Sequence, residues 1–380
     1  MKKIILKYLI GNISNKELES LILWLQKSKN QDVFKQIVRE NYNLDIKLRS
    51  IDSNTGWLKV KPKLKDKSGL FFSRTIKYAA AACLIGILVT GYVFKDNLFS
   101  TPQSKTPIIV NNNIEHGTDK AILTLDTGEI ITLEKDRAYQ IPNATSNGKE
   151  IVYGEGEKQD KQVVYNTLTV PRGGQFKITI ADGTQVWLNS ESQIKYPVSF
   201  TEGETRQVEL VYGEAYFDVV SSAEYKGSDF KVYNNNQEIK VLGTEFNIKA
   251  YKDESYIYTT LVEGKITINT VNQNQILIPN QQAILNTKDD GLLVQTVNAT
   301  TETLWRQGIF SFRGKPLGDI MKVISRWYDV NVVFEDKNMK DFIFVGVLNK
   351  DQNIVDLMDA VRNSSFISTY MIDGKTIIIK

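Results

Sequence analysis

The chain has 380 residues, which is room for two or three domains, and its 42% hydrophobic and 24% charged residues are ordinary for a globular protein. It contains one cysteine, Cys83, and one histidine, His116, which excludes an internal disulfide and a cysteine-rich metal site. The net charge of +3 hides an asymmetry, because residues 1–77 carry 17 Lys and Arg against 7 Asp and Glu, so the rest of the chain is acidic.

Residues 1–55 are predicted to form a small all-α domain. Apolar residues recur at the spacing of helix faces up to residue 25, and a further helix fits residues 32–48. Ser14, followed three residues later by Glu17, is a capping box that marks a helix start. Three short helices make a small core, so we expect them to complete their burial against a partner, although a large side chain such as Trp24 could equally fill the bundle. The candidate partner-binding residues are Tyr8, Leu9, Ile13, Leu21, Trp24 and Leu25.

The segment that follows is basic. Residues 56–77 carry seven Lys and Arg and a single acid, Asp66. We interpret them as a juxtamembrane segment held against anionic lipid, with nucleic-acid binding as the alternative. The positive-inside rule then places the N-terminus in the cytoplasm and the C-terminal part outside it.

Residues 78–94 contain no charged residue and are predicted to form a single transmembrane helix. A helix of this length spans roughly 26 Å, slightly less than the hydrocarbon core of about 30 Å. Lys77, Tyr78, Tyr92 and Lys95 would anchor its two ends at the membrane surfaces. The alternative is a buried core helix.

Residues 95–117 are predicted to be a linker, because they are polar, contain prolines and lack a helical period. The apolar period then changes to two, which predicts an all-β domain over residues 118–298, either a sandwich or a solenoid-like stack. The clearest case is QFKITIADGTQVWLN, with a tight turn at Asp182-Gly183. The segment AILTLDTGEIITLE repeats this design 55 residues earlier, which indicates related structural units.

Residues 303–380 are predicted to form an α/β module. The expected order is strand, helix, strand, strand, helix and a final hairpin, which is typical of compact α/β folds. In the first helix, Leu317, Ile320, Ile324 and Trp327 would face inward. The predicted fold class is therefore multi-domain, with a small all-α cytoplasmic domain, one transmembrane helix, an all-β exported domain and a C-terminal α/β module.

Several strings of this sequence resemble the FecR family of membrane anti-sigma factors, in its Bacteroidetes form. The most specific are NTLTVPRGGQFKITIADGTQVWLNSESQIKYPVSF at residues 166–200, and then VELVYGEAYFDVV, VLGTEFNIKAY and TLVEGKITI. The string KYLIGNIS…LWL is similar to the family's cytoplasmic anti-sigma segment. FRGKPLGDIMKVISRWYDVNVVFED resembles the family's C-terminal domain, which is similar to the secretin/TonB short N-terminal module.

The resemblance implies an inner-membrane anti-sigma factor whose C-terminus lies in the periplasm. Its cytoplasmic segment would sequester an extracytoplasmic-function sigma factor. Its exported part would read the signalling domain of a TonB-dependent outer-membrane transporter and so control nutrient-uptake genes. A single helix transmits a conformational change poorly, so we expect regulated proteolysis by membrane proteases.

We expect no cofactor, no metal site, no direct nucleic-acid partner and no enzymatic activity. The alternative function is a membrane-tethered periplasmic β-domain that binds an envelope glycan or protein. Aromatic residues of the β region permit this alternative, but most of them alternate like packed strand residues.

The Gly243-Thr244 pair in VLGTEF is the candidate self-cleavage site that the resemblance implies. In some family members such a pair is cut when the Thr hydroxyl attacks the preceding carbonyl. This intramolecular nucleophilic attack needs a strained peptide and no cofactor. The alternative is a glycine at a strand edge followed by a threonine that favours strands.

Overall fold

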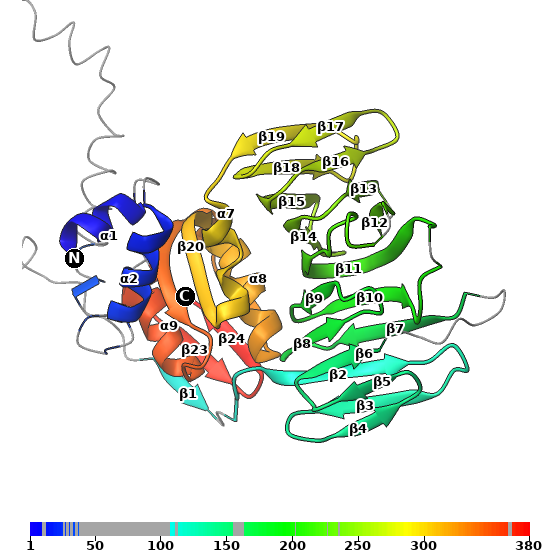
Figure 1. Cartoon of the computed structure of the whole chain (residues 1–380). Helices are drawn as coiled ribbons and strands as arrows, with labels where there is room; N and C mark the ends of the chain where they lie inside the picture. Colours follow the sequence, from blue (N-terminus) through cyan, green and yellow to red (C-terminus); the bar gives the residue numbers. More distant parts are fainter. Residues whose placement is uncertain are drawn as a thin grey trace, which may run out of the picture.

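The computed structural model contains a large β-domain, a smaller C-terminal module and a pair of N-terminal helices (Figure 1). The predicted juxtamembrane segment, the predicted transmembrane helix and most of the predicted linker lie outside the residues that the structure describes. The described residues are 1–9, 13–25, 27, 30, 33–34, 37, 107–110, 113–154, 163–201, 203–225, 227–234, 236–363 and 367–380.

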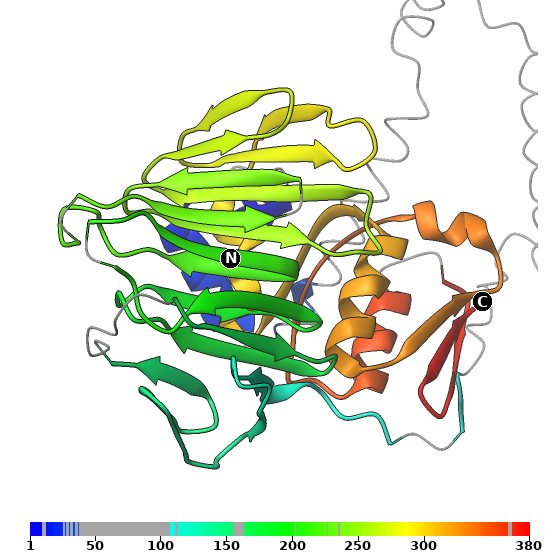
Figure 2. The same ribbon diagram turned by 90° about the vertical axis from the view of Figure 1, so that its right-hand side faces the viewer.

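The β-domain consists of 18 linked strands, stacked one above another (Figure 2). They are β2 (Thr118–Thr124), β3 (Ile130–Glu134), β4 (Tyr139–Ile141), β5 (Ala144–Ser146), β6 (Glu150–Tyr153), β7 (Tyr165–Val170), β8 (Gly174–Thr179), β9 (Gln185–Leu188), β10 (Ser192–Pro197), β11 (Arg206–Asp218), β12 (Phe230–Asn234), β13 (Gln237–Val241), β14 (Glu245–Ala250), β15 (Tyr256–Glu263), β16 (Ile266–Asn269), β17 (Asn274–Leu277), β18 (Gln281–Asn286) and β19 (Leu292–Thr296).

The strands form two sheets that share β11. One sheet has the order β3-β2-β7-β10-β11-β12-β13-β16-β17, and the other β4-β5-β6-β8-β9-β11-β14-β15-β18-β19. Strand β11 passes between them at Gly213, because residues up to Tyr212 pair in the first sheet and those from Gly213 onward pair in the second. Gly213 has a φ of +100°, and a Cβ there would lie 2.2 Å from Ser192 Oγ, so this crossing requires glycine.

The hydrophobic core of the β-domain lies between the two sheets. Alternate residues of a strand point into it, as Phe176 and Ile178 of β8 do. The β2–β3 and β8–β9 hairpins, which the sequence repeat relates, turn in the same way. The N–H of Gly128 donates to the carbonyl of Leu125, and the N–H of Gly183 donates to that of Ile180. The local design is therefore repeated, although the two hairpins belong to different sheets.

The C-terminal module packs two helices against two small sheets around a second core. One sheet pairs β20 with β22 antiparallel, and the other has the order β1-β23-β24-β21. The helix face predicted to point inward, which contains Leu317, Ile320, Ile324 and Trp327, is buried there. The elements of this part are α7 (Ala299–Glu302), η2 (Leu304–Gln307), β20 (Ile309–Pro316), α8 (Leu317–Tyr328), β21 (Asn331–Phe334), η3 (Lys337–Asp341), β22 (Ile343–Asn349), α9 (Ile354–Asn363), β23 (Tyr370–Asp373) and β24 (Thr376–Ile379), joined by β1 (Ile108–Val110).

Two N-terminal helices, α1 (Lys2–Leu9) and α2 (Asn15–Leu25), pack on the β20–β22 pair (Figure 1). The capping box predicted before α2 is present, since the N–H of Ser14 donates to Glu17 Oε2 over 3.1 Å and the N–H of Glu17 donates to Ser14 Oγ over 3.4 Å. The helices share their apolar core with Leu304 and with strand residues of the module. They are therefore not a separate domain.

The predicted fold class needs correction on this point and on one other. The N-terminal helices are part of a common core with the C-terminal module, because three short helices bury too little apolar surface alone. In the described ranges, no helix is both long and apolar enough to cross a membrane. The predicted fold class is therefore wrong in its separate all-α domain, and the described part of the chain is mostly β. Residues 78–94 themselves lie outside the described residues.

Candidate functional site at the domain junction

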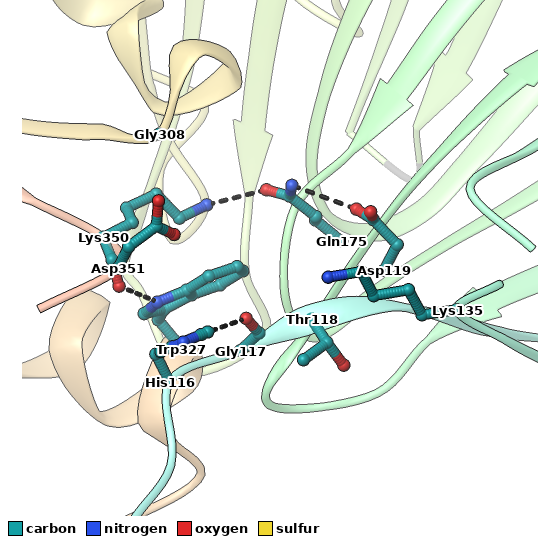
Figure 3. A pocket seen from close by; sticks show the side chains of 10 residues that line it. All are labelled: His116, Gly117, Thr118, Asp119, Lys135, Gln175, Gly308, Trp327, Lys350 and Asp351. Atoms are coloured by element: carbon teal, nitrogen blue, oxygen red, sulfur yellow. Dashed lines mark hydrogen bonds between the residues drawn. The ribbon is translucent and has the colours of Figure 1, made fainter. Parts of the chain in front are cut away.

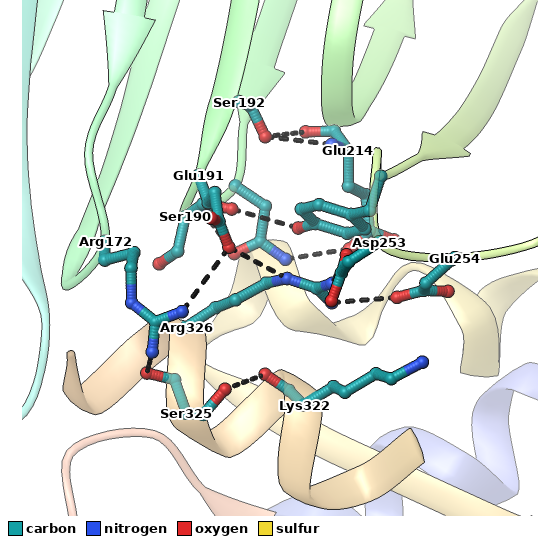
Figure 4. A network of polar contacts seen from close by, with 12 residues as sticks. Arg172, Ser190, Glu191, Ser192, Glu214, Asp253, Glu254, Lys322, Ser325 and Arg326 are labelled. Atoms are coloured by element: carbon teal, nitrogen blue, oxygen red, sulfur yellow. Dashed lines mark hydrogen bonds and ion pairs between the residues drawn. The ribbon is translucent and has the colours of Figure 1, made fainter. Parts of the chain in front are cut away.

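The C-terminal module contacts the β-domain where α8 meets the loops after β7, β9 and β14 (Figure 4). We call this contact the junction. It is made of charged side chains and aromatic rings from segments that are far apart in the sequence. Because it joins the two largest parts of the molecule, it decides whether they move as one body.

Arg326, in the last turn of α8, is the centre of the polar contacts at the junction. Its side chain is only 3% exposed, yet it reaches three carboxylates of the β-domain. Nε donates to Glu191 over 3.1 Å and Nη1 donates to Glu254 over 2.8 Å, while Nη2 pairs with Asp253. The guanidinium also lies 3.6 Å from the ring centre of Tyr251, which is the geometry of a cation–π contact.

The carboxyl group of Glu254 stays ionised at this partly closed site. Burial raises its pKa, but the ammonium of Lys249 and the guanidinium of Arg326 outweigh burial and lower the pKa below its usual value. Lys249 lies 2.7 Å from Glu254 Oε2. On this side of the junction, the buried charges of Arg326 and Glu254 each have at least one partner, which is the condition for tolerating buried ions.

Arg172 makes a second connection, from the turn between β7 and β8. Its Nη2 donates to the backbone carbonyls of Ser325 and Val330 over 2.7 and 2.6 Å. The N–H of Gly173 donates to the carbonyl of Arg326 over 2.7 Å. Carbonyls in the last turn of a helix lack an intrahelical partner, so the bond from Gly173 to Arg326 lets this turn of the β-domain cap α8 of the module. Its Gly173 has a φ of +67°, which a side chain would strain.

Lys350, which follows β22, is a buried cation at the other side of the junction (Figure 3). The residue is 1% exposed, and Nζ donates to Gln175 Oε1 of β8 over 3.0 Å. Nζ lies 3.6 Å from the ring centre of Trp327, and two further rings, of Trp305 and Phe310, lie within 6 Å. The second hydrogen-bond acceptor of this ammonium, the carbonyl of Trp305 at 3.5 Å, is also neutral. Burial lowers the pKa of Lys350 to about 7.

A small cavity lies beside Lys350, with a volume of about 110 Å³ (Figure 3). His116, Asp119 and Asp351 are among the residues that line it. Pockets for drug-sized ligands occupy about 300–1,000 Å³, so this cavity is too small for a glycan. Across the described residues, no group of three or more His, Cys, Asp or Glu side chains is arranged to hold a metal ion. The geometry of the junction is that of a fixed contact between two domains.

The residues predicted to bind a partner at the N-terminus mostly point into the core shared with the module. Tyr8, Ile13, Leu21 and Leu25 are buried, and Trp24 is partly buried. The side chain of Leu9, the remaining candidate, lies outside the described part of the structure. Ile13 lies between the two helices and the other candidates lie on them, and the buried side chains of Tyr8, Ile13, Leu21 and Leu25 are not free for another protein in this arrangement.

Tyr8 makes the polar contacts between the helix pair and the module. Its hydroxyl lies 2.8 Å from Ser311 Oγ, and burial raises the pKa of this hydroxyl to about 12. Arg313 donates to the backbone carbonyl of Tyr8 and lies 5.3 Å from the centre of its ring. The contact is thus a specific one, made of hydrogen bonds and apolar packing together.

The candidate self-cleavage pair lies in the turn between β13 and β14. Gly243 has a φ of +141°, and a Cβ there would lie 2.8 Å from the Cα of Ser221, so the turn needs glycine. Thr244 is 5% exposed, and its hydroxyl donates to the carbonyl of Lys265 over 3.2 Å. Cleavage at this pair stays a prediction.

The four residues predicted to anchor a membrane helix, Lys77, Tyr78, Tyr92 and Lys95, lie outside the described residues. Sequence reasoning did not find Arg326, Arg172 or Lys350 as functional residues. The only signal was the inward position of Trp327 on its helix, next to Arg326.

The fold and the junction define a protein of two joined parts, a two-sheet β-domain and an α/β module, each recognised by its own family model. The model described as FecR protein matches residues 166–267, and the one described as FecR, C-terminal, matches residues 309–379. The chain belongs to the FecR family, as the resemblance predicted.

Solved structures agree with this assignment. Two crystal structures of a protein from Parabacteroides distasonis, provisionally assigned as an anti-sigma factor, are 28% identical to this chain. Their TM-scores are 0.52 and 0.51, and the matches cover 56% and 57% of this chain and 98% of those chains. None of the curated proteins compared with the chain matches it.

Proposed function

We propose that this protein is an anti-sigma factor that acts in cell-surface signalling. The observation that carries the proposal is the family membership of both of its larger parts, at residues 166–267 and 309–379. The similarity to a provisionally assigned anti-sigma factor from Parabacteroides distasonis supports it. A family with this role is regulatory.

The partner on the N-terminal side is proposed to be an extracytoplasmic-function sigma factor, bound by the α1–α2 pair. The support is the apolar face of these helices, whose candidate binding residues are buried against β20 and β22. A surface that is buried in one contact can be used for a partner only after that contact opens. Placing the helix pair and the module on opposite sides of a membrane, as proposed below, would expose this face to the sigma factor.

The partner on the other side is proposed to be the signalling domain of a TonB-dependent outer-membrane transporter, with control of nutrient-uptake genes as the outcome. Self-cleavage at Gly243-Thr244 is proposed as a first step, and membrane proteases are proposed to transmit the signal by regulated cleavage. The family resemblance supports this self-cleavage site; the φ of +141° at Gly243 does not add to it, because glycine adopts this conformation without strain.

The location also stays a proposal: the inner membrane, with the N-terminus in the cytoplasm and the C-terminus in the periplasm. In a molecule so placed, the contact between Tyr8 and Ser311 could not form. A reporter fused after residue 100 tests the location, since activity of the reporter in the cytoplasm would contradict it. A chemical crosslink between positions 8 and 311 in cells would contradict it as well.

The sigma-factor proposal is tested with the full-length tagged chain purified from its native host. We expect mass spectrometry to find a sigma factor with the natural chain, and to find little of it with Trp24→Ala, because Trp24 is the candidate that is only partly buried in the core. Lys16→Ala, at an exposed position of the same helix, is the matched control and should behave like the natural chain. Absence of any sigma factor from the natural chain would refute the proposal, and equal recovery with Trp24→Ala would exclude Trp24 from the contact.

The cleavage proposal is tested by comparing the natural chain with Thr244→Ala in the membrane fraction. Cleavage predicts a shorter fragment of the natural chain that the variant lacks, because the variant has no hydroxyl to attack the preceding carbonyl. Equal masses with no fragment in either would rule the site out.

A further inference from the structure

Strand β1 is an unusual part of the C-terminal module, because it comes from the segment that precedes the β-domain. It pairs in parallel with β23, with Ile108 opposite Met371, Ile109 opposite Ile372 and Val110 opposite Asp373. It forms one edge of the four-stranded sheet. The module therefore completes its sheet with a strand from a distant part of the chain, nearly 200 residues before its own first strand.

The side chains of β1 contribute little to its attachment. Ile108 is 56% exposed, Ile109 44% and Val110 43%, and none of them belongs to the core of the module. The contact is made by the main chain, for example by the N–H of Gly374, which donates to the carbonyl of Val110 over 3.2 Å. A strand held only by its backbone can be replaced by any segment that offers the same backbone groups.

The strand is also shorter than the edge on which it lies. Pro107 immediately precedes it and has no N–H to donate, and β1 pairs with only three of the four residues of β23. Strands in globular proteins usually have five or six residues. A longer strand without proline would form more hydrogen bonds with this edge than β1 does.

The chain after β1 is held firmly. Gly117 lies against the ring of Trp327, where a Cβ would come within 2.5 Å, and the N–H of Thr118 donates to the carbonyl of Gly173 over 3.0 Å. These contacts lie at the junction. If β1 separated from the β23 edge, the chain would therefore still be held from Gly117 onward. Release of β1 would leave the two larger domains in place.

We propose that the β23 edge is a strand-addition site and that β1 covers it until an extended segment of a partner protein displaces it. The partner segment is at least five residues long, free of proline and rich in β-branched apolar residues, like the Ile-Ile-Val of β1. Covering the edge prevents unwanted pairing while the partner is absent. The signalling consequence, a change in the chain that leads to α1 and α2, rests on the proposed function, whereas the strand exchange does not.

The test uses the purified full-length chain and a fluorescent peptide as the probe. The peptide has the sequence of residues 106–113 with threonine in place of Pro107, so it can pair over a greater length. The free-edge variant carries Ile108→Pro, Ile109→Pro and Val110→Pro, because β1 is attached by its main chain and proline cannot support a ladder. The locked variant carries Val110→Cys and Asp373→Cys, which are opposite each other, in a Cys83→Ser background.

We expect the free-edge variant to bind the peptide at least about tenfold more tightly than the natural chain, because a tethered strand competes at high effective concentration. The oxidised locked variant should not bind, and reduction should restore binding. A control peptide with proline at the position of Ile109 should bind to none of them, since proline cannot support a β ladder.

Three results would overturn the proposal. These are failure of the free-edge variant to bind the peptide, equal binding by the locked and the natural chain, or equal binding of the control peptide. When the peptide is bound, the β23 amides of the free-edge variant should also exchange more slowly. Slower exchange at other strands, with no change at β23, would count against the proposal. None of these results depends on recovery of a sigma factor, so the outcome is separate from that of the proposed function.

Discussion

The substitution Arg326→Ala is expected to loosen the junction between the C-terminal module and the β-domain. Two of the three carboxylates that it contacts, Glu191 and Asp253, are 40% and 60% exposed and can return to water, so each pair contributes little. Glu254 is 11% exposed and keeps Lys249 as a partner. Removing Arg326 therefore destabilises the Glu254 carboxylate by less than the 3–5 kcal/mol typical of a buried charge left without a partner.

The contact with Tyr251 adds to this loss, since a desolvated cation–π pair contributes about 2 kcal/mol. We therefore expect Arg326→Ala to lower the free energy of opening the junction by about 3 kcal/mol, a factor of roughly 150 in the opening equilibrium. The assay is native-state hydrogen exchange, followed at the amide of Gly173, which donates to the carbonyl of Arg326.

The matched control is Lys322→Ala on the same helix. Lys322 is 39% exposed and its ion pair with Asp319 is 3.9 Å long, so its removal should change the opening free energy by less than about 0.5 kcal/mol. If Gly173 exchanges at the same rate in both variants, the ion pairs of Arg326 do not hold the junction closed and the reasoning is wrong.

Three further predictions concern other parts of the molecule. Because burial lowers the pKa of Lys350 to about 7, from 10.5, the unfolded state holds a proton between these pH values that the folded state has lost. Stability of the natural chain should therefore rise in this range by up to about 1.4 kcal/mol per pH unit, whereas Lys350→Met should lack the rise when both are melted at pH 7, 8 and 9. Gly213→Ala should destabilise the β-domain by about 3 kcal/mol or more in urea unfolding, because its Cβ would overlap Ser192, and a loss below 1 kcal/mol would contradict the proposed crossing. Tyr8→Phe should weaken the packing of the helix pair on the module by about 1 kcal/mol, because the hydrogen bond to Ser311 is lost. The α1 amides should then exchange faster with solvent, and an unchanged exchange rate would refute this prediction.

Local features of this fold follow from the sequence because neighbouring residues determine them. The alternation through Phe176 and Ile178 predicts a strand with one buried face, and the Asp-Gly turn after it has the expected positive φ at Gly183. The capping box of Ser14 and Glu17 depends on residues only three apart. The C-terminal module was predictable for the same reason, since each of its helices and strands has its own period.

Contacts between distant segments could not be predicted in this way. Arg326 meets Glu191, which is 135 residues away, and nothing around either residue in the sequence indicates the other. The crossing of β11 at Gly213 depends on close approach to Ser192 in another strand. The helices α1 and α2 have an apolar face, from which the sequence predicts a contact with another protein. The sequence does not show that β20 and β22 of the same chain cover this face.

The junction also determines where a conformational response can occur. Arg326, Arg172 and Lys350 each connect the module to the β-domain through buried or partly buried contacts, so binding at either part should leave their relative position unchanged. Strand β1 has no comparable contacts, because its side chains are exposed and only its backbone is paired. Among the described residues of this region, the amides of β1 should therefore exchange faster than those of β24, the other neighbour of β23. Equal protection of β1 and β24 would mean that the β23 edge is closed as firmly as the interior of the sheet, and a partner strand could then enter only by unfolding the module.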